Sequence, residues 1–158
     1  REANGQKVYW SRGNGWVLAG LASVIQALPP NDPRRARYIR QFEQMAARIA
    51  SLQGKDGLWR PGLLDAGAYP LPEISGSAFF VYGLAWGINH GVLDRTKYLP
   101  VDRAAWKGLT AHVYADGRLG SIQSIGAAPG AYGPSASYVF GVGAFLLAGA
   151  ELEALVSE

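Results

Sequence analysis

The chain has 158 residues, 49% of them hydrophobic and 17% charged, which suits one globular domain with a single core. It contains no cysteine, and this excludes disulfide bonds and thiolate metal sites. The formal net charge is only +3, and no run of Lys and Arg alternates with aromatic residues, so nucleic acid is not an expected partner.

Five helices are expected, and the first two differ in type. The first, from about residue 13 to 28, is mostly apolar and ends at Pro29-Pro30, because proline cannot continue a helix. The second starts at Asp32-Pro33 and runs to about residue 53. Its apolar residues recur every three or four positions, and arginines occupy the other face. This pattern is typical of an outer helix with one buried face.

The remaining three helices continue this alternation. The third, from about residue 75 to 90, is apolar nearly all round, which predicts burial on most sides. The fourth, from near Pro100 to about residue 114, carries Asp102 and Arg103 on its polar side and is again an outer helix. The fifth, from about residue 137 to 156, is apolar and rich in glycine. Glycines within the inner helices indicate that these helices approach closely.

Helix-start signals repeat at nearly equal spacing. Gly13, Ser75 and Ser137 each lie at the start of an inner helix and are separated by 62 residues. A second signal, Asp56-Gly57 and Asp116-Gly117, recurs after 60 residues, and we expect these aspartates to form turns. Such a period predicts repeated helical hairpins. Few of these repeats fit into the chain, so we expect it to be part of a larger ring.

The starts of the inner helices are expected to form a shared rim that binds an anionic sugar. Two loops of about 20 residues, 54–74 and 115–135, precede inner helices and belong to this rim. Helix N-termini favour negative charge. Arg12, between Trp10 and Trp16, suits a sugar acid, because guanidinium binds carboxylate and indole covers a pyranose ring. The alternative is that Arg12 pairs with a carboxylate of the chain and that the tryptophans lie in the core.

Other candidate residues are less specific. Glu73 precedes the third helix and either caps it or contacts a ligand, whereas Asp65 stays unassigned. No catalytic residue is assigned, although glycoside hydrolysis usually requires two carboxyl groups. His90 and His112 lack the spacing of metal ligands, so neither a metal nor a cofactor is expected. The candidate substrate-binding residues are Trp10, Arg12, Asn14, Trp16, Glu73, Ser75 and Tyr132.

Five motifs occur in order along the chain: Trp10-Ser11-Arg12-Gly13-Asn14-Gly15-Trp16, Asp56-Gly57-Leu58-Trp59, Glu73-Ile74-Ser75-Gly76-Ser77-Ala78, Tyr82-Gly83-Leu84-Ala85-Trp86-Gly87-Ile88 and Gly141-Val142-Gly143-Ala144-Phe145-Leu146-Leu147-Ala148-Gly149. Together they resemble glycoside hydrolase family 105, the unsaturated rhamnogalacturonyl hydrolases. These enzymes are relatives of the unsaturated glucuronyl hydrolases of family 88. The resemblance implies an all-α, six-hairpin α/α toroid, of which residues 1–158 would form one partial-barrel domain of about five helices.

The resemblance also implies a reaction. Family members hydrate the double bond of a 4,5-unsaturated uronic acid at the end of a pectin-derived oligosaccharide. An aspartic acid protonates C4, water adds at C5, and the hemiketal opens to release the neighbouring sugar. The Arg and Trp of the family's Arg-Gly-x-x-Trp motif hold the substrate and correspond to Arg12 and Trp16. The family's aspartate lies well upstream of this motif, so we expect the 158-residue chain alone to be inactive.

Three alternatives remain open at this stage. The chain is a non-catalytic module that binds acidic sugars or assists assembly, or it belongs to another α/α toroid enzyme, such as a cyclase or lyase. In that second case its catalytic groups, Asp65 and Glu73, would lie in the long loops. The third alternative is a structural fragment whose exposed barrel seams drive self-association into a dimer or larger species. No apolar run is expected to span a membrane, and a cytoplasmic location is expected.

Overall fold

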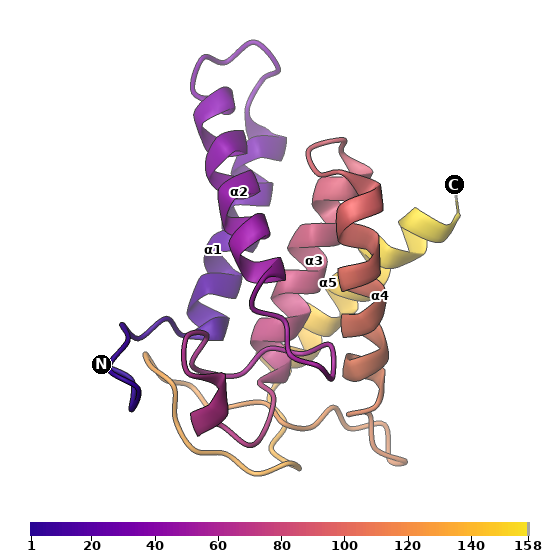
Figure 1. The fold of residues 1–158 in the computed structure, drawn as a ribbon. Helices are drawn as coiled ribbons and strands as arrows, with labels where there is room; N and C mark the ends of the chain where they lie inside the picture. The colour runs from indigo at the N-terminus through magenta and orange to yellow at the C-terminus, as the bar shows by residue number, and fades with distance from the viewer. Residues whose placement is uncertain (158) are drawn as a thin grey trace.

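The computed structural model describes residues 1–157, which fold into five α-helices joined by long loops (Figure 1). The all-α class is confirmed, and most helices begin and end within three residues of the expected positions. The helices are α1 (Ser11–Ala27), α2 (Arg35–Ala50), α3 (Ile74–Asn89), α4 (Arg95–Thr110) and α5 (Val139–Val156), and a short 3-10 helix, η1 (Ala66–Ala68), lies in the first long loop.

The expected start of the fourth helix near Pro100 is wrong. Helix α4 begins at Arg95, where the Asp94 side chain caps it by accepting a hydrogen bond from the backbone N of Thr96 at 2.7 Å. Pro100 lies inside the helix, in its second turn. Proline has no N–H, so the carbonyl of Thr96 loses its helical partner, but the capped first turn and packing on α3 hold the helix.

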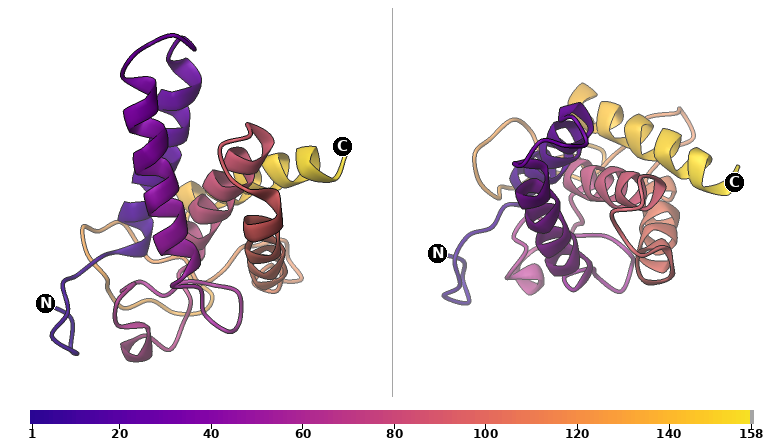
Figure 2. Two further views of the ribbon diagram at one scale, coloured as in Figure 1. Left: turned by 45° about the horizontal axis from the view of Figure 1, so that its top comes forward. Right: turned by 90° about the horizontal axis from the view of Figure 1, so that it is seen from above.

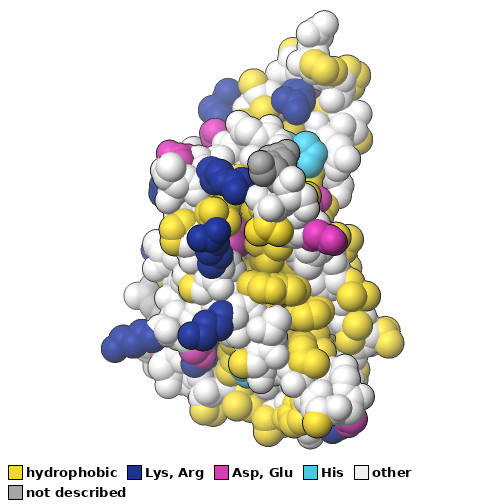
Figure 3. Space-filling model, turned by 90° about the vertical axis from the view of Figure 1, so that its right-hand side faces the viewer, with side chains coloured by type: hydrophobic (Ala, Val, Ile, Leu, Met, Phe, Trp, Pro, Cys, Tyr) yellow, Lys and Arg dark blue, Asp and Glu magenta, His cyan; other side chains and the backbone are white. Residues whose placement is uncertain are grey.

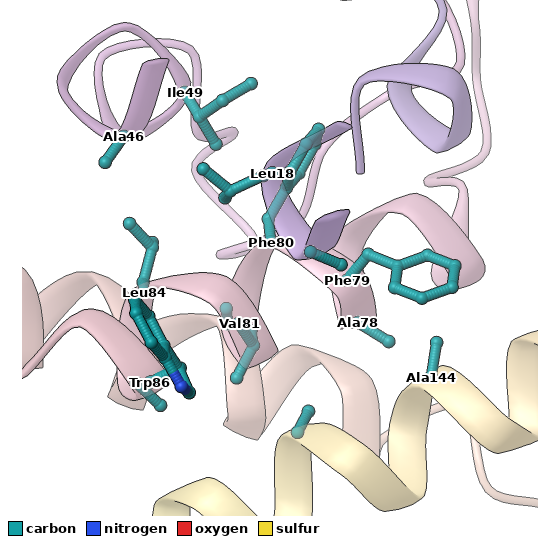
Figure 4. Packing of buried hydrophobic residues seen from close by; sticks show 14 of the residues in the cluster. Leu18, Ala46, Ile49, Ala78, Phe79, Phe80, Val81, Leu84, Trp86 and Ala144 are labelled. Carbon is teal, nitrogen blue, oxygen red and sulfur yellow. The ribbon is translucent and has the colours of Figure 1, made fainter. Parts of the chain in front are cut away.

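The helices form two layers in the expected order. Helix α3 packs between α1 and α5, while α2 covers α1 and α4 covers α3 (Figure 2). Every residue of α3 is buried except Tyr82 and Asn89, as its apolar sequence predicted. The core therefore centres on α3. Figure 4 shows core side chains from four helices: Leu18 of α1, Ala46 and Ile49 of α2, Phe80 and Leu84 of α3, and Ala144 of α5.

Asp102 does not lie on an exposed polar face, contrary to expectation. Its side chain is 0% exposed on α4. The reason is its position on the helix: it lies four residues after Tyr98 and three before Ala105, on the face of α4 that is buried. The first long loop packs along α4, with the Gln53 side chain donating to the carbonyl of Val101 at 2.8 Å and Gly57 lying against the backbone of Ala104. The expectation that Asp102 and Arg103 share a polar side is therefore wrong, because Arg103 is exposed while Asp102 is buried.

The three inner helices begin at one end of the molecule, beside both long loops (Figure 1). The first backbone N–H of α1, at Ser11, donates to the carbonyl of Pro61 at 2.8 Å. The first N–H of α3, at Ile74, donates to the carbonyl of Ser121 at 3.0 Å. Pro61 and Ser121 are 60 residues apart, so each long loop supplies an acceptor to the inner helix that precedes it. The inner helices thus start at a shared rim, as expected, and the binding of a sugar there stays a prediction.

The repeated Asp-Gly pairs form equivalent turns, as expected. The side chains of Asp56 and Asp116 each accept a hydrogen bond from the backbone N–H two residues later. Gly57 and Gly117 both have φ of 82°, in the left-handed region that favours glycine. The role of these aspartates is therefore to form turns.

Helix α5 exposes much of its apolar surface. Val139 is 87% exposed and Leu146 64% exposed, and Figure 3 shows a band of hydrophobic side chains on this side of the molecule. By length and composition α5 is capable of crossing a bilayer, so the expectation that no run is long enough is wrong. A buried core helix meets the same criterion, and α5 packs one face on α3. Association of the exposed faces with a second copy stays a prediction.

The crossing of α1 and α3 requires glycine at position 76. A Cβ there would lie 2.8 Å from the backbone N of Arg12. We expect Gly76→Ala to lower the free energy of unfolding by about 2–3 kcal/mol, because the two backbones must separate. Gly20→Ala is the matched control, since a Cβ there meets nothing within 4 Å and should stabilise α1 by roughly 0.5–1 kcal/mol. Urea unfolding of both variants measures the difference, and equal stabilities would contradict the tight crossing.

Candidate functional site

Arg12 lies where the starts of the three inner helices meet. It is the second residue of α1 and is only 3% exposed. Its guanidinium stacks over the ring of Trp10 at 4.4 Å and over the ring of Phe140, at the start of α5, at 4.6 Å. It also donates a hydrogen bond to Ser75 Oγ of α3 at 3.3 Å. One cation thus contacts all three inner helices.

The second long loop fixes the orientation of the Arg12 guanidinium. Nη1 donates to the carbonyl of Gln123 at 2.6 Å, and Nη2 donates to the carbonyl of Ser124 at 2.5 Å. A guanidinium has five N–H donors, and three are engaged when the bond to Ser75 is included. Burial lowers the pKa of Arg12, and the charge of Glu73 opposes this shift. The group is held in one plane with donors still available for a ligand.

Glu73 is a buried cap behind Arg12. It is 0% exposed, and its carboxylate accepts hydrogen bonds from the backbone N of Gly76 at 2.7 Å and of Gln123 at 3.0 Å. One oxygen lies 3.7 Å from Arg12 Nη1. Burial raises the pKa of Glu73, whereas the hydrogen bonds from Gly76, Ser75 and Gln123 and the charge of Arg12 act in the opposite direction. Of the two roles expected for Glu73, the structure shows the cap of α3.

A cavity of about 280 Å³ opens beside Arg12. Trp16 forms part of its wall, is 55% exposed, and packs its ring against Phe79 with centroids 4.3 Å apart. Trp16 is therefore not a core residue, although Arg12 does pair with a carboxylate of the chain. Aromatic walls with one cation suit the apolar face and the carboxylate of a sugar acid. The lining residues are Trp10, Arg12, Trp16, Ile125, Gly126 and Phe140.

The other predicted residues lie outside this cavity. Asn14 donates from its side chain to the carbonyl of Trp10 at 2.8 Å and lines a separate hollow of about 380 Å³ with Arg48. The Tyr132 hydroxyl donates to the carbonyl of Leu71 at 3.1 Å, and its ring lines another hollow of about 380 Å³. The structure thus brings Trp10, Arg12, Trp16, Glu73 and Ser75 together and leaves Asn14 and Tyr132 apart.

Sequence reasoning missed the part of the second long loop that contacts Arg12. Gln123 and Ser124 supply carbonyls to the guanidinium, and Ile125 lines the cavity. Ser121, two residues earlier, adopts φ of 54°, which is uncommon for a residue other than glycine. The 60-residue repeat is a signal for this segment, because Ser121 occupies the place that Pro61 has in the first loop.

Known proteins share both the sequence and the fold. The family model of Glycosyl Hydrolase Family 88 matches residues 1–156. An unsaturated 3S-rhamnoglycuronyl hydrolase from Formosa agariphila is 48% identical over 152 residues, which cover 96% of this chain and 40% of that protein. A solved structure named as a polysaccharide lyase is 44% identical, with a TM-score of 0.93, over 100% of this chain and 46% of its own. A possible family 105 member from Salmonella enterica is 26% identical, with a TM-score of 0.81, over 92% of this chain and 39% of its own.

These matches extend along nearly the whole chain, but the chain spans only about 40% of the length of the curated relatives that it matches. The partial α/α toroid is confirmed, because the five helices superpose on part of larger structures of this type. The resemblance to families 105 and 88 is confirmed as well. The chain belongs to Glycosyl Hydrolase Family 88.

Proposed function

We propose that this chain binds the 4,5-unsaturated uronic acid end of an oligosaccharide as part of an unsaturated glycuronyl hydrolase. The proposal rests on the cavity in which the buried, oriented guanidinium of Arg12 lies beside the exposed indole of Trp16. The remaining donors of Arg12 would bind the uronate carboxylate, and Trp10 and Trp16 would cover the ring. The nearby starts of the inner helices favour the same negative charge.

The name of the Formosa relative favours rhamnose as the neighbouring sugar. At 48% identity, its unsaturated 3S-rhamnoglycuronyl substrate is a closer guide than the pectin-derived rhamnogalacturonan that the sequence resemblance implied. We therefore propose an unsaturated uronic acid joined to rhamnose as the substrate class. The reaction would protonate C4 and add water at C5, after which the hemiketal opens and releases the rhamnose.

The residues described here would bind and orient the substrate and would not supply the proton. Arg12 retains its charge, and within residues 1–157 the one carboxylate closer than 4 Å to it, Glu73, is fully buried and engaged by backbone N–H groups. A general acid must reach C4, and a sealed carboxylate cannot do so. We therefore propose that binding, and not turnover, is the property of the 158-residue chain alone.

Calorimetry and ultraviolet absorbance on one sample test this proposal. The chain is mixed with a disaccharide of unsaturated glucuronic acid and rhamnose. We expect measurable binding without loss of the absorbance of the conjugated double bond. Loss of absorbance would overturn the inert character of the chain, and absence of binding would overturn the sugar-binding function. The saturated disaccharide, which has no absorbing double bond, is the control for the optical signal.

A lyase is the second candidate, because one similar structure carries that name. A lyase creates the unsaturated end that a hydrolase consumes, so the two activities change the absorbance in opposite directions. If the chain were a lyase, absorbance would rise with an uncleaved uronic-acid polymer. Asp65, an expected catalytic group in this alternative, accepts a hydrogen bond from the backbone N of Asn4 at 3.0 Å and does not line the Arg12 cavity. This position favours the hydrolase proposal.

A further inference from the structure

Gln123 connects the start of α1, the residue that caps α3 and the second long loop beside the Arg12 cavity. Its backbone N donates to Glu73 Oε1 at 3.0 Å, and its carbonyl accepts from Arg12 Nη1 at 2.6 Å. Its side-chain Oε1 accepts from the indole Nε1 of Trp10 at 3.1 Å, while its Nε2 donates to the carbonyl of Ala128 at 2.8 Å. Each of its backbone and side-chain polar groups therefore has a partner, and the residue is only 4% exposed.

The loop after Gln123 folds around its side-chain amide. A Cβ at Gly126 would lie 3.5 Å from Gln123 Nε2, and one at Gly130 would lie 3.3 Å away. Within this loop, Ser124 accepts from Arg12, and Ile125 and Gly126 line the cavity. The bond to Ala128 thus closes a short loop that forms one wall, and the bond to Trp10 fixes the indole that forms another.

We propose that Gln123 is a positioning residue of the sugar-binding cavity. Its amide aims the Trp10 indole and holds residues 124–128 at the distance from Arg12 that a uronate ring requires. Gln123 does not line the cavity, so it would act through Trp10 and the loop. This inference rests on the proposed function for its ligand, but the positioning itself is a property of the ligand-free chain.

Substitution of the side chain isolates this role, because the backbone bonds to Glu73 and Arg12 remain. Gln123→Met keeps the length of the side chain and removes both amide hydrogen bonds. We expect it to weaken binding of the unsaturated glucuronyl-rhamnose disaccharide about three- to tenfold, the range for loss of ordinary hydrogen bonds. In the ligand-free NMR spectrum, the Trp10 indole N–H signal, identified with Trp10→Phe, should move, and the amides of residues 124–128 should exchange faster.

Gln53→Met is the matched control. Gln53 is a half-buried glutamine that also fixes a loop, through donation from Nε2 to the carbonyls of Gly57 and Val101, but it lies against α4 and away from the cavity. Its substitution should lower thermal stability without moving the Trp10 signal or the affinity. Gln123→Glu separates the effect of the hydrogen bond with Trp10 from that of the hydrogen bond with Ala128. It keeps an acceptor for Trp10 and loses the donor to Ala128, so only the loop amides should respond.

A double-variant cycle completes the test. If Gln123 acts partly through Trp10, the losses of affinity caused by Gln123→Met and Trp10→Phe should sum to more than that of the double variant. An unmoved Trp10 signal and unchanged loop exchange in Gln123→Met would overturn the inference. If the unsubstituted chain does not bind the disaccharide, the proposed function fails, whereas the ligand-free spectra still decide whether Gln123 positions the cavity walls.

Discussion

Arg12→Met is expected to lower the free energy of unfolding by about 3–5 kcal/mol and to weaken sugar binding roughly 10- to 100-fold. The variant leaves the Glu73 carboxylate buried without its counter-charge, and it leaves the carbonyls of Gln123 and Ser124 without their donor. Methionine retains the apolar contacts with the rings of Trp10 and Phe140, so the loss reports the charge and its hydrogen bonds. Urea unfolding and calorimetric titration measure the two effects.

A second substitution separates the ion pair from the loop contacts. Because Arg12 and Glu73 interact, the double variant Arg12→Met with Glu73→Gln should lose less stability than the sum of the single variants, by at least about 1 kcal/mol. Arg48→Met, at an exposed arginine of α2, is the control and should change stability by no more than about 0.5 kcal/mol. Additive losses would show that the 3.7 Å pair contributes nothing and that the carbonyl contacts explain the whole effect.

Asp102→Asn is expected to stabilise the chain at pH 7 by more than about 1 kcal/mol, the equivalent of one pKa unit, opposite to the usual effect of a core substitution. Asp102 is 0% exposed, and among residues 1–157 neither of its carboxylate oxygens has a hydrogen-bond partner. Burial raises the pKa of Asp102 well above its ordinary value, because the charged form is poorly solvated inside α4's contact surface. Asparagine keeps the shape of the side chain and has no proton to lose, so it avoids the cost of keeping Asp102 protonated at pH 7. Thermal unfolding at several pH values measures the gain.

The sign of the pH dependence follows from the raised pKa of Asp102. Above about pH 4 the unfolded chain releases the Asp102 proton while the folded chain retains it, so the contribution of this group falls as pH rises and is lost once pH passes the folded pKa. The advantage of Asp102→Asn should therefore grow from about pH 4 upward. Asp116→Asn, in an exposed turn, is the control for loss of a carboxylate. Equal stability of Asp102→Asn and the parent chain at every pH would contradict an uncompensated buried carboxylate.

The sequence pattern was sufficient to predict the alternation of inner and outer helices and the common rim at which the inner helices start. The apolar character of residues 75–90 and the one-sided pattern of residues 35–50 reflect how many neighbours each helix has, so periodicity reports their layers. The Asp-Gly turns were predictable, because a left-handed φ requires glycine at those points. Arg12, Trp10 and Trp16 were found together because they are close in sequence as well as in space.

What the sequence could not indicate depends on contacts between distant segments. Gln123 meets Trp10 across 113 residues, and no local pattern distinguishes it from a solvated glutamine. Asp102 lies at helical spacing from Tyr98, Ala105 and Leu109, which are all buried, but its charge suggested an exposed position. Asn14 sits within the most informative motif, but the helical turn directs its side chain to the carbonyl of Trp10 and away from the cavity. Each case requires the tertiary arrangement, which local propensity does not encode.

The acceptors that Pro61 and Ser121 provide have a consequence for cooperativity. The first backbone N–H of each of the inner helices α1 and α3 donates to a carbonyl in the long loop that leads to the next inner helix. Melting one hairpin therefore withdraws a hydrogen-bond acceptor from the hairpin before it, and because coupling free energies are reciprocal, each of the two hairpins stabilises the other. Nearest-neighbour dependence of this kind favours a single concerted transition over stepwise loss of hairpins.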